Sequence, residues 1–169
     1  ANTPTIVGSS GTYWVSASQA GCAVSDTVVV TVNPAPVVEL GNNFTLCSGD
    51  AATLDATYPG ATYTWSTGAT APSINVSTAN TYSVVLDLNG CTATDAVTVS
   101  VLDLGAIDLG PDVTLCAGET TVLDATLAGV THSWSNGANT PTITVGSSGT
   151  YWVSASQAGC AVSDTVVVT

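Results

Sequence analysis

The chain contains no lysine and no arginine, while it carries twelve acidic residues and a formal net charge of −12. Without basic side chains it cannot neutralise a phosphate backbone, so nucleic-acid binding is excluded as a function. The same absence excludes a lysine isopeptide cross-link, a Schiff-base lysine and an arginine clamp on phosphate. Any function of this chain therefore depends on other groups.

Charged residues of either sign are scarce at 7%, whereas apolar residues reach 45%. That balance is typical of a chain that folds and not of an acidic disordered tail. No apolar run approaches the ~20 residues that a membrane-spanning helix needs, so no membrane span is expected. No signal peptide opens the sequence, which fits a mature fragment.

What the sequence does have is an internal repeat. Equivalent residues recur at a constant spacing, which is the number of residues from Cys22 to Cys91. Three sets of equivalent residues show it: Cys22, Cys91 and Cys160; Tyr13, Tyr82 and Tyr151; and Asp26, Asp95 and Asp164. Residues 1–31 also match residues 138–169, apart from one residue missing between Ile6 and Val7. The repeat predicts a tandem array of two alternating module types, cut from a longer polymer. Its parts are a partial module over 1–31 and modules over 32–100 and 101–169.

Within each repeat, short segments rich in Val, Thr, Tyr and Ile alternate with Gly, Pro, Asn, Asp and Ser turns, as in a β-sandwich. No segment has helical periodicity, so the predicted fold class is all-β. The strands expected in the module over 32–100 are 37–40 with 44–47, 52–57, 62–66, 70–72, 73–77, 81–88 and 92–101. Alternation directs one face of these strands into a core of Leu54, Trp65, Ile74, Val76, Tyr82, Val84, Val97, Val99 and Val101. Asn89-Gly90 predicts a tight hairpin between the last two strands.

Several motifs recur in both modules. The first module has Leu46-Cys47-Ser48-Gly49, Trp65-Ser66-Thr67-Gly68-Ala69, Asn80-Thr81-Tyr82, Gly90-Cys91 and Asp95-Ala96-Val97. The second has Leu115-Cys116-Ala117-Gly118, Trp134-Ser135-Asn136-Gly137, Gly149-Thr150-Tyr151, Gly159-Cys160 and Asp164-Thr165-Val166. Over the whole chain these motifs resemble the immunoglobulin-like or PKD-like repeats of large secreted surface proteins of Bacteroidota, including gliding-type adhesins. The resemblance implies tandem β-sandwich modules in cell-surface stalks, adhesin arrays or filaments, and it specifies no activity.

The five cysteines stand at fixed repeat positions, without a CxxC motif and with a single histidine in the chain. This pattern favours structural disulfides over metal ligands or thiol catalysts, and with them a periplasmic or extracellular setting. A local pairing joins Cys47 to Cys91 and Cys116 to Cys160, and leaves Cys22 for a partner outside the chain. A sandwich, however, holds the members of each local pair at opposite poles, ~20 Å or more apart, whereas a disulfide allows a Cα separation of only ~7 Å. The alternative bond, Cys47 to Cys160, would staple adjacent modules, and the sequence leaves both pairings open.

The carboxylates are the only candidates for metal chemistry. Asp103, Asp108 and Asp112 cluster at the junction between the two modules, where several oxygen ligands would suit Ca²⁺ and fix the angle between modules. The alternative is that they are solvated charges which keep an apolar surface soluble. The sequence predicts no other cofactor.

Two threonines are candidate modification sites. Thr27 and Thr165 each follow an aspartate and precede a valine, which matches the pattern that the resembled phylum uses for O-glycosylation. The middle repeat has Ala96 at this position and cannot accept a sugar there. A threonine in a strand is also ordinary β-propensity, so both interpretations stand.

Trp14 and Trp152 each follow a core tyrosine, so alternation turns them away from the core. Each is either an exposed contact for lateral packing or sugar stacking, or is covered by a neighbouring strand. His132 replaces Tyr63 on a strand face. No arrangement of nucleophile, base and cleft is signalled, so no enzymatic activity is expected.

The sequence therefore predicts a structural segment of an extracellular bacterial stalk, adhesin shaft or filament, which gives reach and stiffness. Its expected partners are neighbouring copies of the same repeat, while a module that binds surface glycans through the exposed tryptophans is the alternative. The partial module carries only the last three strands of a sandwich, so either preceding residues or a second chain would complete it.

Overall fold

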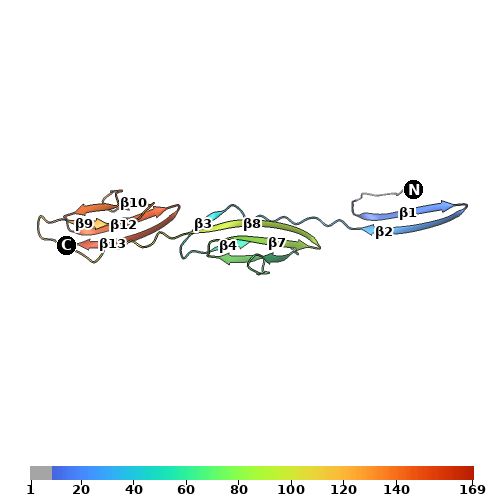
Figure 1. Ribbon diagram of the computed structural model, residues 1–169, viewed down its shortest axis with the longest axis horizontal. Coiled ribbons are helices and arrows are strands. Elements are labelled where there is room, and N and C mark those ends of the chain that lie inside the picture. Colours follow the sequence, from blue (N-terminus) through green and yellow to red (C-terminus); the bar gives the residue numbers. More distant parts are fainter. Residues whose placement is uncertain (1–8) are drawn as a thin grey trace.

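The computed structural model describes residues 9–169, and within this range every regular element is a β-strand. A β-hairpin and two strand-rich modules follow one another along the long axis of the molecule (Figure 1). We call residues 9–31 the N-terminal hairpin, 32–100 the first module and 101–169 the second module. The first predicted strand of the partial module, and the residue missing between Ile6 and Val7, lie outside the described residues.

Three tight hairpins share one turn. In the N-terminal hairpin, β1 (Gly11–Gln19) joins β2 (Cys22–Val30) through Ala20 and Gly21, whose φ angles are 49° and 84°. Two successive residues with positive φ are the signature of a type I′ turn. The equivalent turns lie at Asn89-Gly90 and Ala158-Gly159, so the hairpin predicted from Asn-Gly is confirmed.

The first module packs two sheets face to face. Its strands are β3 (Phe44–Cys47), β4 (Ala52–Asp55), β5 (Thr62–Trp65), β6 (Ser73–Val76), β7 (Asn80–Leu88) and β8 (Cys91–Leu102). One sheet has the order β3-β8-β7-β5, with β3 parallel to β8, and the other pairs β4 with β6. Seven of the predicted core residues are buried between the sheets: Leu54, Trp65, Val76, Tyr82, Val84, Val97 and Val99. Ile74 and Val101 are only partly buried.

The second module repeats this plan. Its strands are β9 (Thr121–Asp124), β10 (Thr131–Trp134), β11 (Thr142–Val145), β12 (Gly149–Gln157) and β13 (Cys160–Val168). They form one sheet of order β10-β12-β13 and a second that pairs β9 with β11. A single parallel bridge from Val113 to Val168 stands where the first module has β3. Each module has a hydrophobic core of its own.

Two of the expected strands do not form. Residues 37–40 join no sheet, and the backbone N–H of Leu40 donates instead to the Asp95 carboxylate at 2.6 Å. Residues 70–72 form a loop, in which the Ala71 carbonyl accepts from the Trp65 indole and the Pro72 carbonyl accepts from Ala56 N–H. In both segments, some backbone groups bond to partners outside a sheet ladder.

The N-terminal hairpin has the sequence of β12–β13 but lacks the second sheet that covers β12–β13. Val15 is 52% exposed and Val28 57% exposed, whereas their counterparts Val153 and Val166 are fully buried. The difference arises because β9, β11 and the segment around Ile107 and Leu109 pack over β12–β13 in the second module.

Candidate functional site

The residues with the most distinctive chemistry meet at the junction between the two modules. The parallel pairing of β3 with β8 places Cys47 opposite Leu102, at the end of the first module. The chain then crosses Asp103, Leu104 and Gly105 into the second module. The β12–β13 hairpin brings Cys160, the first residue of β13, back to the same place.

Cys47 and Cys160 form a disulfide across this junction, with a Cα–Cα distance of 5.5 Å and a sequence separation of 113 residues. The bond between modules is therefore the one that forms, and the local pairings of Cys47 with Cys91 and of Cys116 with Cys160 are wrong. The reason is the length of β8: Cys47 lies beside its last residue and Cys91 is its first. At ~3.3 Å per residue the two lie roughly 36 Å apart.

The other three cysteines, Cys22, Cys91 and Cys116, are free thiols in the described part of the chain. Cys22 and Cys116 are exposed, whereas Cys91 is partly buried, with its Sγ 3.8 Å from the Asn33 carbonyl. Neither Cys91 nor Cys116 has a partner within its own module.

Beside the disulfide lies a shallow hollow of about 220 Å³. Its lining comes from both modules and the linker, and includes Cys47, Leu102, Asp103, Cys160 and Val162. The Ser48 N–H donates to the Leu102 carbonyl at 2.9 Å, which ties the turn after β3 to the linker. The disulfide thus joins two backbone segments that are themselves held in place.

The three aspartates proposed as calcium ligands are exposed, and each accepts a separate backbone hydrogen bond. Asp103 accepts from Gly105 N–H at 2.9 Å, Asp108 from Gly110 N–H at 2.8 Å and Asp112 from Val167 N–H at 2.9 Å. No group of three or more acidic, histidine or cysteine side chains close enough to hold a metal ion occurs between residues 9 and 169. Calcium binding at these residues stays a prediction.

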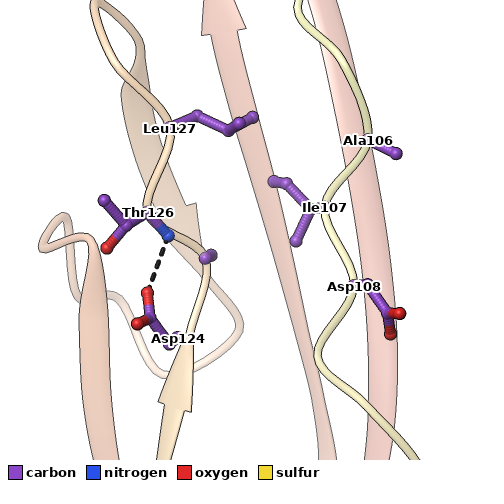
Figure 2. A pocket seen from close by; sticks show the side chains of 7 residues that line it. Ala106, Ile107, Asp108, Asp124, Thr126 and Leu127 are labelled. Carbon is purple, nitrogen blue, oxygen red and sulfur yellow. Dashed lines mark hydrogen bonds between the residues drawn. The ribbon is translucent and has the colours of Figure 1, made fainter.

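Figure 2 shows a second hollow, of about 430 Å³, between residues 106–108 and the end of β9. Ile107 points into it, whereas the Asp108 carboxylate points away and Asp124 accepts a 2.8 Å hydrogen bond from Thr126 N–H. Hydrogen bonds from Thr126 hold the pKa of Asp124 below its usual range. A hollow of the same make-up lies one repeat earlier, beside Val38. It is therefore a feature of the fold that recurs in both modules.

Asp164 has a structural role that sequence reasoning missed. Its carboxylate accepts from Leu109 N–H at 2.7 Å, as Asp95 does from Leu40, and so ties the first segment of the module to its last strand. The hydrogen bonds from the Leu109 and Thr165 backbones lower the pKa of Asp164. The signal for this role is that every repeat has an aspartate at this position, Asp26, Asp95 or Asp164, but the sequence does not show which group the carboxylate bonds to.

The exposed tryptophans and the candidate threonines are neighbours. Trp152 lies directly across from Thr165 in the β12–β13 pair, and Trp14 lies across from Thr27 in β1–β2. Trp152 remains 45% exposed in the completed second module, and both threonines are exposed. In the first module the same cross-strand pair is Ser83 with Ala96. The two positions that distinguish the module types thus form one patch on the outer face.

The remaining polar aromatics serve the folded core. Trp65 and Trp134 are buried, and the Trp134 indole N–H donates to the Thr140 carbonyl at 2.8 Å. His132 is also buried, and its Nε2 lies 2.9 Å from the Ala125 carbonyl. Because that partner can only accept, Nε2 carries the proton and the ring is a structural donor.

A tyrosine in each repeat reaches back to the backbone four residues upstream. Tyr13, Tyr82 and Tyr151 donate to the carbonyls of Ser9, Thr78 and Ser147 at 2.7, 3.0 and 3.0 Å. A tyrosine near the start of the sixth strand that bonds upstream in this way is typical of immunoglobulin sandwiches. Alternation assigns these tyrosines to the core but does not predict the bond.

Solved structures with a similar fold are themselves tandem arrays. A fragment of titin with domains I67–I69 aligns with a TM-score of 0.54 and 13% identity, over 95% of this chain and 74% of that one. Extracellular domains 3–5 of Drosophila OTK align with a TM-score of 0.50 and 12% identity, over 95% and 70%. No family model matches the sequence, and no curated protein matches it either.

These similarities show the fold: the chain is an all-β array of immunoglobulin-like modules. At such low identity they carry nothing about activity or ligands. No helix in the described residues is long and apolar enough to cross a membrane.

Proposed function

We propose that the chain is a structural segment of an extracellular stalk, adhesin shaft or filament, in which immunoglobulin-like modules strung end to end give reach and stiffness. The observation that carries the proposal is the Cys47–Cys160 disulfide, which joins one module to the next instead of closing a loop within either. A bond at this place limits bending between modules. It also fits an oxidising compartment outside the cytosol.

Composition supports the same role. The chain carries no basic residue and a net charge of −12, so like charge repels and favours an extended array over collapse. The motif resemblance to surface proteins of Bacteroidota supports a bacterial cell surface as the setting. Neighbouring copies of the repeat are the partners that this role requires, and no catalytic role is proposed.

The test is the distribution of angles between the modules, measured on single molecules by negative-stain microscopy. We expect a narrow distribution for the oxidised chain and a broad one for Cys47→Ser or after reduction. Cys22→Ser is the matched control, since it removes a cysteine without touching the bond. Equal breadth in the oxidised chain and in Cys47→Ser would refute a stiffening role.

A second candidate function is contact with a surface glycan through the outer-face patch. It is favoured by the exposure of Trp152 in a completed module and by its cross-strand neighbour Thr165, which is also the candidate for O-glycosylation, as Thr27 is beside Trp14. Flat aromatic rings are suited to stack on sugars because they have an apolar face and one polar atom. Binding to a glycan array that is lost in Trp152→Ala and kept in Val122→Ala, another exposed apolar residue of the second module, would support it.

A further inference from the structure

The three free cysteines occupy the same repeat positions as the two that are bonded. Cys116 stands one repeat after Cys47, while Cys91 and Cys22 stand one and two repeats before Cys160. Each free thiol is therefore the counterpart of one half of the observed bond. In the observed bond, the position of Cys47 in one module pairs with the position of Cys160 in the module that follows.

Cys116 has the local structure that presents Cys47 to its partner. The turn after Cys47 closes with a 2.9 Å bond from Asp50 N–H to the Cys47 carbonyl, and the turn after Cys116 closes with a 3.0 Å bond from Glu119 N–H to the Cys116 carbonyl. Leu115 N–H donates to the Thr169 carbonyl at 2.8 Å, which holds Cys116 at the far end of the second module. The thiol is exposed there.

Cys91 is presented like Cys160. It starts the last strand of its module, directly after a type I′ turn, and its Sγ lies 3.8 Å from the carbonyl of Asn33 in the linker. Leu102, the equivalent of Asn33, lines the hollow beside Cys160. A 3.2 Å bond from the Asn33 side chain to the Asn89 carbonyl holds this hairpin against the linker. Cys91 lacks only a partner, which would be a cysteine at the position of Cys47 or Cys116 in the module that precedes the first module.

The order of the module types says which module supplies that cysteine. The N-terminal hairpin has the sequence of β12–β13 and leads directly into the first module, so a module of the first type follows one of the second type. We propose that Cys116 of one unit and Cys91 of the next form a second disulfide between modules, so that every junction of the array is covalently stapled. This inference rests on the proposed structural role and names the partner: a module of the 32–100 type seated on the end of the second module.

Within one copy of this chain the bond cannot form. Cys91 lies roughly 36 Å from the stapled junction on one side, since it starts β8. Cys116 lies beside Thr169 at the other end of the second module, as Figure 1 shows for the C-terminus. The partner therefore comes from another module in the array.

Forming the bond requires an electron acceptor. The Cys91 thiolate first attacks oxidised glutathione, which gives a mixed disulfide of Cys91 with glutathione and releases one glutathione thiolate. The Cys116 thiolate then attacks the Cys91 sulfur of this mixed disulfide and expels the second glutathione thiolate. Overall, two protein thiols and one oxidised glutathione give one protein disulfide and two reduced glutathiones. The two electrons lost by the cysteines are those gained by glutathione.

A protease that cuts before aspartate suits the test, because it places each of the five cysteines in a different peptide. Cys91 is in peptide 87–94 and Cys116 in 112–123, while Cys47 and Cys160 are in 26–49 and 124–163. The sample is the full chain followed by a second copy of residues 32–100, with Cys22→Ser and Cys91→Ser in the original part. It is oxidised in a glutathione buffer, alkylated and digested without reduction.

We expect peptide 112–123 to be linked to the peptide 87–94 of the added module, and the link to vanish in Cys116→Ser. Alkylated Cys116, or a bond between the two cysteines of the added module, would overturn the inference. The same digest reports the 26–49 to 124–163 link. Loss of the 26–49 to 124–163 link would count against the proposed function. If that link is present and Cys116 is free, only the proposed second disulfide is refuted.

The unextended chain distinguishes neighbours on one polypeptide from separate copies. If separate copies form the bond, a non-reducing gel shows multiples of 16.7 kDa that collapse on reduction. If only the monomer appears while the extended chain forms the bond, the staple belongs to successive modules of one polypeptide.

Discussion

Pulling the chain by its two ends tests how the Cys47–Cys160 disulfide changes the path of mechanical force through the chain. With the disulfide intact, force that enters at residue 32 reaches Cys47, crosses to Cys160 and leaves through β13. The covalent path bypasses the 113-residue segment between the two cysteines, so this segment cannot be extended while the disulfide holds. The β1–β2 hairpin, which precedes residue 32 and has no covering sheet, should open first. The interactions that fail next are those of β3, a four-residue ladder, and of β13.

The size of the effect follows from chain length. An extended chain spans about 3.3–3.6 Å per residue, so the 113 residues within the loop hide roughly 370–410 Å of contour. Force spectroscopy on the oxidised chain should never release this length, because a covalent bond holds it. After reduction, or in Cys47→Ser, the same length should appear in unfolding steps.

The control is Cys22→Ser, which should behave like the unaltered chain. If the oxidised chain releases the full contour length at ordinary unfolding forces, the disulfide does not carry the load. If the reduced chain gains no length, the two modules were not enclosed by the bond.

Other predictions concern the modules and the junction. Trp134→Phe should destabilise the second module by about 1–3 kcal/mol in urea unfolding, because the Thr140 carbonyl loses its donor. Ala158→Asn should stabilise it by up to about 1 kcal/mol, because Ala158 has a φ of 50° that asparagine tolerates better, as Asn89 does in the first module. The lowered pKa of Asp164 means that its contribution to stability is present above the unfolded pKa of about 3.9 and is lost as pH falls through the folded pKa. The urea midpoint should therefore drop between pH 6 and pH 3, and drop less in Asp164→Asn. EGTA tests the calcium prediction: a fall in melting temperature would support it, whereas an unchanged melting temperature would show that the three junction aspartates are solvated and accept only their separate backbone N–H groups.

The sequence predicted the sandwich where period and alternation agreed. The buried faces of β4, β7 and β8 follow from apolar residues at every second position, and the hairpin turn follows from Asn89-Gly90. It failed at residues 37–40, where valines favour a strand but the backbone N–H of Leu40 bonds to a side chain and not to a neighbouring strand. The partner there is Asp95, which is 55 residues away, and no local pattern announces such a bond.

The disulfide shows a different limit. Spacing within the repeat favoured Cys47 with Cys91, while the sandwich topology favoured Cys160, and the sequence could not weigh one against the other. The decision rests on which pole of each module carries which cysteine. The position of Cys47 depends on the parallel pairing of β3 with β8. Strands assigned from the sequence do not show which strands pair.

The position of the bond changes what it stabilises. An immunoglobulin domain of antibody type places its disulfide through the core, between the second and sixth strands, against a buried tryptophan. Here the corresponding strands β4 and β7 present Leu54 and Val84 to the core, and Trp65 packs there without a disulfide. Core packing alone therefore closes each sandwich, and the covalent bond is left for the junction. Because each sandwich folds without an internal disulfide, modules can be repeated many times. The disulfide between modules then sets the stiffness of the junction.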